Sequence, residues 1–146
     1  MKTSEIQITY KNQIPLSERF QITSSHSADE YFKEIWDEDL ELRESFYVLF
    51  LDQKNRVKGY TLISKGGISW TVVDIRIIFA IALKSLSTGI LIGHNHPSSD
   101  TKPSTSDKNL TKKIKDAGDL VDINLLDHII ITPEGRYFSF ADEGLL

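Results

Sequence analysis

The alternation of hydrophobic and polar positions changes character twice in the first third of the chain. Residues 5–10 alternate one by one, which predicts an edge strand, and residues 12–27 are polar around Pro15, which predicts an extended linker. From residue 28 to residue 42, apolar side chains return at helical spacing and share one face, opposite a largely acidic one. That apolar face consists of Phe32, Ile35, Trp36 and Leu40.

Two short apolar segments and one long apolar segment follow. Residues 45–52 and 57–64 are rich in aromatic and β-branched side chains and flank a polar turn, so they predict a β-hairpin. The pair Gly66-Gly67 ends this pattern. Asp74 is a suitable N-cap for a helix over residues 75–86. Because this helix is apolar around most of its circumference, we expect it to lie buried at the centre of the fold.

The rest of the chain predicts alternating strands and helices. Gly89 suits a left-handed C-cap, and a strand over residues 90–93 leads directly to His94. A helix should begin at Ser104 and end at Gly118, with an inward stripe of Leu110, Ile114 and Ala117. Two strands over residues 123–132 and 136–140 follow, joined by a proline-containing turn. The fold class is therefore α/β (α+β), with helices packed on a mixed, mostly antiparallel sheet.

Length and composition are those of one soluble domain. The 146 residues suit a single hydrophobic core, so we expect an N-terminal strand and linker over residues 1–27 and one domain over residues 28–146. The N-terminus has no apolar leader, and the most apolar run, residues 75–83, is interrupted by Arg76 and too short to span a bilayer. We expect a cytoplasmic protein with no membrane partner. Because the chain has no cysteine, any metal must be held by histidine or carboxylate side chains.

The charge distribution argues against a broad nucleic-acid partner. The formal net charge is −4, whereas phosphate binding depends mainly on clustered positive charge. The largest concentration of basic residues is a run of lysines, Lys108, Lys112, Lys113 and Lys115. A local basic patch and a solvated helix face are both compatible with this run, and the solvated face is favoured.

Two of the four histidines, His94 and His96, lie one residue apart at the end of a predicted strand. Side chains at positions i and i+2 of a strand point to the same side, so the two imidazoles could bind one Zn²⁺ at about 2.0–2.1 Å each. Pro97 makes the chain leave the sheet, and the loop returns Asp107 in the first turn of the next helix. Three such ligands leave a fourth position for water, which is typical of catalytic zinc.

Each part of this pattern also has an ordinary structural interpretation. Ser104-x-x-Asp107 fits a helix cap, and a cap would itself fix the direction of Asp107, so the two roles are compatible. His94 and His96, taken alone, could be ordinary loop histidines. The metal site is favoured by the whole combination of H-x-H, a proline-bounded loop and S-x-x-D.

The spacing H-x-H, seven residues, S-x-x-D resembles the JAMM signature of the JAB/MPN metallopeptidases. The run HNHPSSDTKPSTSD, followed by KNLTKKIKDAG and LLDHIII, is similar specifically to the RadC-like branch, over roughly residues 20–146. The resemblance implies a JAB/MPN-like fold of cytidine deaminase-like architecture. It also implies one Zn²⁺ per chain, held by His94, His96 and Asp107, and a protein or peptide substrate.

The resemblance assigns two catalytic roles that the residues alone do not. Glu44 matches the family glutamate expected to act as general base, whereas composition leaves Glu38, Asp39 and Glu41 equally suitable. Ser104 matches the family serine expected to help stabilise the oxyanion.

Further residues near the motif stay open between two interpretations. Asp127 and His128 match a recurrent pair that could support the metal ligands or contact substrate, but a strand histidine satisfied by local hydrogen bonds is the simpler interpretation. Asn95, between the two ligands, should point away from the metal. Ser99 replaces a common glycine and Thr101 a common proline, and Ser99 would restrict the loop if a glycine-like conformation is needed there.

The function expected from these features is zinc-dependent hydrolysis of a peptide or isopeptide bond. The alternative is a non-catalytic binding module associated with DNA processing, as the RadC name suggests. The resemblance implies that longer relatives carry a helix-hairpin-helix segment ahead of this domain; we expect no such segment in these 146 residues, which weakens the DNA alternative. A homo-oligomer is also open, because the predicted edge strand at residues 5–10 could pair with a neighbouring copy.

Overall fold

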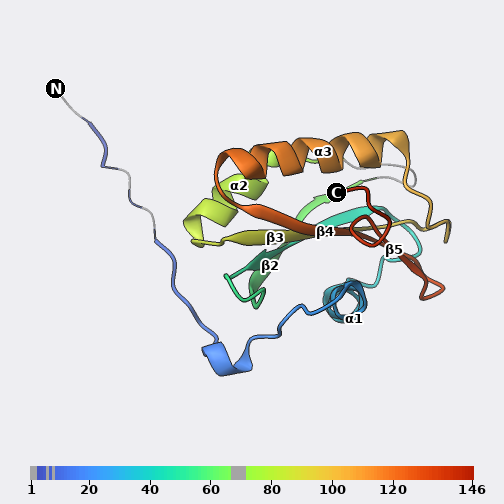
Figure 1. The fold of residues 1–146 in the computed structure, drawn as a ribbon, viewed down its shortest axis with the longest axis horizontal. Coiled ribbons are helices and arrows are strands. Elements are labelled where there is room, and N and C mark those ends of the chain that lie inside the picture. Colours follow the sequence, from blue (N-terminus) through green and yellow to red (C-terminus); the bar gives the residue numbers. More distant parts are fainter. Residues whose placement is uncertain (1–2, 6, 8, 67–71) are drawn as a thin grey trace.

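The computed structural model describes the chain except residues 1–2, 6, 8 and 67–71 (Figure 1). In the described part, five strands form one sheet in the order β2-β1-β3-β4-β5. Their bounds are β1 Ser45–Leu51, β2 Val57–Lys65, β3 Gly89–Asn95, β4 Asn124–Ile131 and β5 Tyr137–Ser139. Only the β3–β4 pair of this sheet is parallel, whereas β1–β2, β1–β3 and β4–β5 are antiparallel. The expected mixed, mostly antiparallel sheet is thus confirmed.

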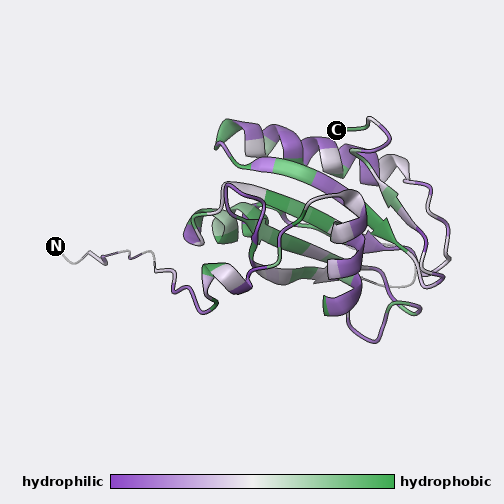
Figure 2. Ribbon diagram, turned by 60° about the horizontal axis from the view of Figure 1, so that its bottom comes forward, coloured by the Kyte–Doolittle hydropathy of each residue, from purple (hydrophilic) through white to green (hydrophobic). Residues whose placement is uncertain are grey.

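Helices cover both faces of the sheet (Figure 1). Helix α1 (Ser25–Ile35) lies against one face, whereas α2 (Ile75–Lys84) and α3 (Thr105–Leu120) lie against the other. A 3₁₀ turn, η1 (Leu16–Glu18), precedes α1. The described residues therefore form three layers with the sheet in the middle, and the central strands of this sheet are coloured mainly as hydrophobic in Figure 2.

Strand β1 illustrates how the two faces are filled. All seven of its residues are buried, and their side chains alternate between two hydrophobic clusters. Leu49 and Leu51 join the cluster beneath α1, while Val48 and Phe50 join the cluster beneath α2 and α3. A strand buried on both faces shows a continuous apolar run rather than an alternating one, which is why the run from Phe46 to Leu51 has no alternation with exposed polar residues.

The crossover from β3 to β4 determines where polar residues can gather. Strands β3 and β4 run parallel, so α3 must carry the chain back across the face before β4 begins. The loop between β3 and α3 therefore leaves the sheet at the carboxyl ends of both strands. The first turn of α3 and the last residues of β3 consequently lie close together at that edge.

The N-terminal predictions need two corrections. Of the predicted edge strand, residues 5, 7, 9 and 10 are described and none belongs to a strand, while residues 6 and 8 lie outside the described residues. The predicted helix over residues 28–42 is wrong at both ends, because α1 spans Ser25–Ile35. Ser24 and Ser27 form a reciprocal capping box that starts the helix three residues early, and Trp36 turns to an extended conformation that ends it.

The apolar helix α2 is not buried all round. Ile78 and Ala82 are fully buried against the sheet, but Ile77 and Leu83 are 47% and 51% exposed, so the expectation of a central, buried helix is wrong. This helix covers one face of the sheet and has no layer above it in the described structure. Hydrophobic composition alone therefore overestimated its burial.

The end of α2 also differs from the prediction. The helix stops at Lys84, and the left-handed residue that follows it is Leu86, with φ 51°, rather than Gly89. Gly89 is instead the first residue of β3. The predicted break at Gly66-Gly67 agrees with the end of β2 at Lys65, although Gly67 lies outside the described residues.

Helix α3 continues two residues beyond its predicted end. Gly118 lies inside the helix, and a β-carbon there would stand 2.3 Å from the carbonyl oxygen of Ile123, so glycine permits a close approach rather than a stop. The buried stripe is Thr111, Ile114 and Gly118, whereas Ala117 is only half-buried. In the described part of the chain, no helix is long and apolar enough to cross a membrane.

Candidate metal centre

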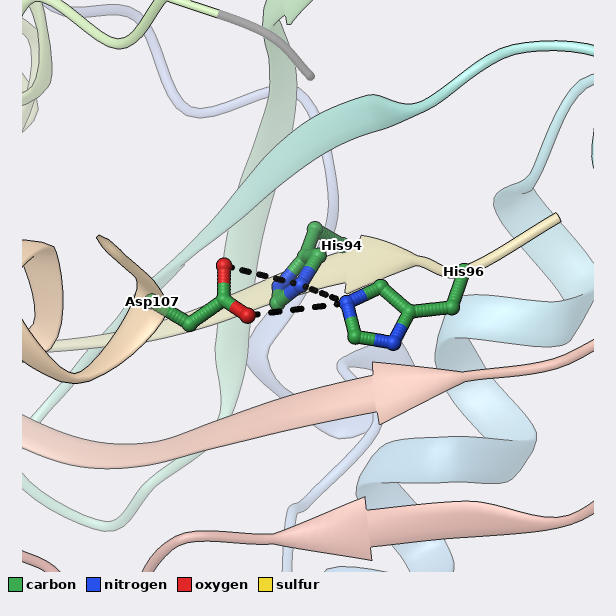
Figure 3. Close-up of side chains that lie close together, drawn as sticks. All are labelled: His94, His96 and Asp107. Atoms are coloured by element: carbon green, nitrogen blue, oxygen red, sulfur yellow. Dashed lines mark hydrogen bonds and ion pairs between the residues drawn. The ribbon is translucent and has the colours of Figure 1, made fainter. Parts of the chain in front are cut away.

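The end of β3 brings His94 and His96 to one side of the chain. His94 lies in the strand, and the amide of His96, just beyond it, still donates to the carbonyl of Ile131 at 3.0 Å. This extra hydrogen bond extends the strand geometry through both residues. Their Nε2 atoms lie 2.9 Å apart, as the i and i+2 spacing predicts (Figure 3).

Asp107 reaches the same point from the first turn of α3 (Figure 3). Its Oδ1 lies 3.4 Å from Nε2 of His94, and its Oδ2 lies 3.6 Å from Nε2 of His96. Ser104 is the N-cap of α3 and forms a capping box with Asp107, whose Oδ2 accepts hydrogen bonds from the Ser104 amide and hydroxyl, both at 2.7 Å. The cap and the convergence of Asp107 on the histidines therefore occur together, as the sequence allowed.

The donor set of these three residues fits a metal ion. One ligand atom from each of His94, His96 and Asp107 lies within 4.8 Å of the other two. The Nδ1 of His96 is 2.6 Å from the carbonyl oxygen of Asp100, which can only accept, so the Nδ1 carries the proton and the Nε2 presents a lone pair. Converging lone pairs and a carboxylate repel one another unless positive charge lies between them. The group could therefore hold a metal.

The electrostatics of the site point in the same direction. Although burial disfavours the ionised form, contacts with the His94 and His96 imidazoles hold the pKa of Asp107 far below its ordinary range. Burial also opposes protonation of His96, but its contact with Asp107 and its hydrogen bond to the Asp100 carbonyl raise its pKa overall. The site therefore attracts positive charge, either a proton or a cation.

Behind His94 lies a fully buried support made of His128 and Thr111, which we call the His94 support. The Nδ1 of His94 is 2.7 Å from the Nε2 of His128, whose own Nδ1 is 2.6 Å from the hydroxyl of Thr111. That hydroxyl donates to the backbone carbonyl of Asp107 at 2.6 Å. Burial holds the pKa of His128 well below its usual value, which favours a neutral imidazole. His128 thus contacts a predicted ligand directly.

Asp127 is not brought to the metal centre. Successive residues of β4 point to opposite faces, and Asp127 faces the α1 side. Its Oδ2 accepts from the hydroxyl of Ser139 at 2.6 Å, and its Oδ1 accepts from the amide of Ala141 at 2.9 Å. In the described structure these bonds connect Asp127 to the end of β5 and to the chain just after it, rather than to the predicted ligands.

Asn95 points away from the two histidines, as expected, and connects β3 to the segment before β1. Its side-chain oxygen accepts from the amide of Ser45 at 2.7 Å, and its side-chain nitrogen donates to the carbonyls of Leu40 and Arg43 at 2.7 and 2.8 Å. The bonded groups of Arg43 and Ser45 stand on either side of Glu44 along the backbone. The fully buried side-chain amide of Asn95 therefore fixes the backbone position from which the Glu44 side chain extends.

Glu44 lines the same cavity as the three predicted ligands. The cavity has a volume of about 710 Å³, and its wall also includes Ser104. Of the four acidic residues that composition left equivalent, only Glu44 belongs to this wall among the described residues. Burial raises the pKa of Glu44 despite the opposing influence of His94 and His96. A half-buried carboxylate with a raised pKa beside a metal site is suited to proton transfer.

The loop between β3 and α3 contains the departure noted at Ser99. Its φ is 63°, in the left-handed region that glycine adopts most easily, so a glycine-like conformation is indeed needed there. The amide of Ser99 donates to the carbonyl of His96 at 3.0 Å, which closes the turn that leads to Asp100. The strained position therefore belongs to the segment that holds His96.

Sequence reasoning did not identify Thr111, nor the hydrogen bonds from Asn95 to the backbone on both sides of Glu44. Thr111 had a local signal, since it lies four residues after Asp107 and can bond to that carbonyl within the helix. Its contact with His128, 17 positions away, depends on how α3 packs on β4. The contact of Asn95 with Ser45 spans 50 positions and depends on the pairing of β1 with β3.

Comparisons with known proteins indicate the family to which the chain is similar. Residues 22–145 match the profile of the RadC-like JAB domain. The chain is 50% identical over 102 residues to a UPF0758 protein of Flavobacterium johnsoniae, covering 70% of this chain and 44% of that protein. It is 42% identical over 104 residues to a UPF0758 protein of Porphyromonas gingivalis, covering 71% and 46% of the two chains.

A more divergent relative matches over a longer stretch. The UPF0758 protein of Aquifex aeolicus is 38% identical over 128 residues, which covers 88% of this chain and 54% of that protein. The chain thus spans about half the length of the curated relatives that it matches.

Proposed function

Because the chain belongs to the RadC-like JAB domain family, we propose that it is a zinc-dependent hydrolase that cleaves a peptide or isopeptide bond. One observation carries the proposal. His94, His96 and Asp107 converge to within 4.8 Å in a cavity that Glu44 also lines. Ligands and a candidate base in one cavity are the minimum that hydrolysis assisted by a metal requires.

Zinc is a metal that this donor set suits. Two imidazoles and one carboxylate are nitrogen and oxygen ligands of the kind that zinc takes in hydrolases. Three protein ligands leave one position for water, which distinguishes a catalytic site from a closed structural one. When bound, zinc would polarise the scissile carbonyl and lower the pKa of its water to about 7.

The residues around the metal position have separate roles in this reaction. Glu44 takes a proton from the attacking water and delivers it to the leaving amine, and its raised pKa suits both directions of transfer. The Ser104 hydroxyl, which donates to Asp107 in this structure, lines the cavity and would turn toward the oxyanion. Asn95 holds the backbone on both sides of Glu44 and so keeps the base in place.

The lining of the cavity supports the proposal of a polypeptide substrate. One part of its wall is apolar and comprises Phe46, Val72, Val73 and Leu110. Other lining residues are polar, among them Ser98, Asp100 and Lys102. Such a cavity suits a polypeptide that places an apolar side chain beside the scissile amide while its backbone bonds to the polar lining.

The test compares wild type with Glu44→Gln on zinc-loaded protein, with Glu41→Gln as the matched control because Glu41 is exposed and outside the cavity wall. A library of peptides and lysine-linked isopeptides is incubated with each, and new amines are detected by mass spectrometry. We expect cleavage by wild type and Glu41→Gln, and a loss of about 10²- to 10⁴-fold in Glu44→Gln with zinc content unchanged. Wild type that holds no zinc under zinc-replete conditions would contradict the proposal.

The DNA-binding alternative has little support in the charge pattern of α3. Lys112 and Lys115 each form an ion pair with the aspartate four residues later, Asp116 and Asp119, at 2.5 and 3.1 Å. These pairs suit a solvated helix face better than a phosphate-binding one. Binding of duplex DNA with a steep salt dependence and no hydrolysis in the peptide assay would favour this alternative.

A further inference from the structure

The hydrogen bonds behind His94 have only one consistent direction. The hydroxyl of Thr111 has one proton, and the Asp107 carbonyl, 2.6 Å away, can only accept it. The same hydroxyl must therefore accept from the Nδ1 of His128, also 2.6 Å away. If it donated to His128 instead, its lone pairs would face the carbonyl lone pairs of Asp107 at hydrogen-bond distance.

The direction of these hydrogen bonds also determines which nitrogen of His94 carries the proton. A neutral imidazole has one N–H, so His128 with its proton on Nδ1 has a bare Nε2. The bare Nε2 accepts from the Nδ1 of His94, 2.7 Å away. The Nε2 of His94 is then left with its lone pair toward Asp107 and His96, where a metal would lie.

We propose that Thr111 and His128 are positioning residues that fix His94 in the tautomer able to bind metal and connect it to the helix that carries Asp107. This inference rests on the proposed function only in taking His94 and Asp107 as metal ligands. The connection joins three elements, because His94 belongs to β3, His128 to β4 and Thr111 to α3. It ends on the backbone of Asp107 itself, so two ligands from different elements share one support.

The alternative is that Thr111 only satisfies its own hydroxyl within the helix, which threonine often does. The two interpretations differ in what happens when the hydroxyl is lost. In Thr111→Val the Nδ1 of His128 has no acceptor, so its proton moves to Nε2 and is donated to His94. His94 then carries its own proton on the Nε2 that faces the metal position, and zinc has to displace it.

The experiment measures zinc affinity by competition with a chromophoric chelator in wild type, Thr111→Val and Thr111→Ser. Thr111→Ser keeps the hydroxyl and should stay within about threefold of wild type, whereas Thr111→Val should bind zinc about 10- to 100-fold more weakly. Thr132→Val is the matched control. Thr132 is equally buried and its hydroxyl also donates to a carbonyl, that of Arg136 at 2.7 Å, but it lies outside the His94 support. It should bind zinc like wild type.

A measurement on wild type keeps the inference falsifiable if Thr111→Val does not fold. Nitrogen-15 NMR of the imidazoles should find the His128 proton on Nδ1 in both the metal-free and the zinc-loaded protein. A His128 proton on Nε2, or equal zinc affinity in Thr111→Val and Thr111→Ser, would overturn the inference. Neither readout depends on hydrolysis, so zinc-binding wild type without peptidase activity would contradict the proposed function and leave this inference standing.

Discussion

The two histidines of the candidate metal centre are held by different supports. His94 has 2% of its side chain exposed and is backed by His128 and Thr111 in the interior. His96 has 16% exposed, and its Nδ1 is held by one loop carbonyl, that of Asp100. One ligand is therefore part of the core, and the other is part of a loop.

The site therefore has two halves, an interior half around His94 and a loop half around His96. The interior half is set by sheet pairing and helix packing, which cannot change without disturbing the hydrophobic core. The loop half lines the cavity together with Ser98 and Asp100. A ligand on a loop can adjust to the metal while the other stays fixed.

The largest expected difference is in stability. In metal-free protein, His94→Ala should lower the free energy of unfolding by about 2–4 kcal/mol, because it leaves a cavity and an unpaired Nε2 on buried His128. His96→Ala should cost about 1 kcal/mol or less. Urea unfolding in the presence of a chelator measures both, with His26→Ala as an exposed control. Equal costs for His94→Ala and His96→Ala would remove the distinction between the two supports.

A second difference should be visible in the response to pH. The pKa of His128 is lowered by burial, while the pKa of His96 is raised by Asp107 and the Asp100 carbonyl in spite of burial. An NMR titration of metal-free protein should therefore show His96 protonating above about pH 6.5 and His128 still neutral well below it. Protonation of His96 and His128 near the same pH would show that burial does not lower the pKa of His128.

The sign of the stability effect follows from these pKa directions. In the unfolded chain His128 takes up a proton near pH 6.5, whereas in the folded protein it stays neutral at that pH. The stability that neutral His128 contributes is therefore lost as the pH falls below about 6.5. The contribution of His96 is fully present below that pH and is lost as the pH rises through its raised pKa. The two histidines thus act on metal-free stability in opposite directions.

The smallest expected effect concerns the loop that holds His96. Ser99→Gly should raise the free energy of unfolding by about 0.5–1 kcal/mol, because glycine adopts a φ of 63° without the cost that serine bears. Thermal unfolding measures the change. Ser98→Gly is the control, since Ser98 is not left-handed and glycine there should be neutral or destabilising. A destabilised Ser99→Gly would mean that the loop is not strained at this position.

Local patterns in the sequence were sufficient for part of the site. His94, His96 and Asp107 could be proposed as a group because strand alternation and helix capping act over a few residues. The structure brings these three side chains together as that reasoning requires. The choice of Glu44 needed the family resemblance, because nothing within a few residues separates it from its acidic neighbours.

Predictions that depended on packing fared less well. Helix α2 was expected to be buried because of its composition, but only the face carrying Ile78 and Ala82 is covered. Composition measures how apolar a helix is, not how many layers lie above it. The end of the same helix was assigned to Gly89, whereas Leu86 takes the left-handed conformation, so the tertiary fold overrode the usual preference for glycine.

The sequence by itself determined the candidate ligand trio, the capped helix that carries Asp107 and the alternation of strands and helices, since each depends on periodicity or on contacts between near neighbours. Only the tertiary structure decided which residues support the three side chains and Glu44, namely His128 next to His94 and Asn95 next to the backbone around Glu44. His94 and His128 are 34 positions apart, and Asn95 and Ser45 are 50 apart. Such pairs meet because the register of β1, β3 and β4 and the packing of α3 align them, and that alignment is a property of the whole hydrophobic core rather than of any one segment.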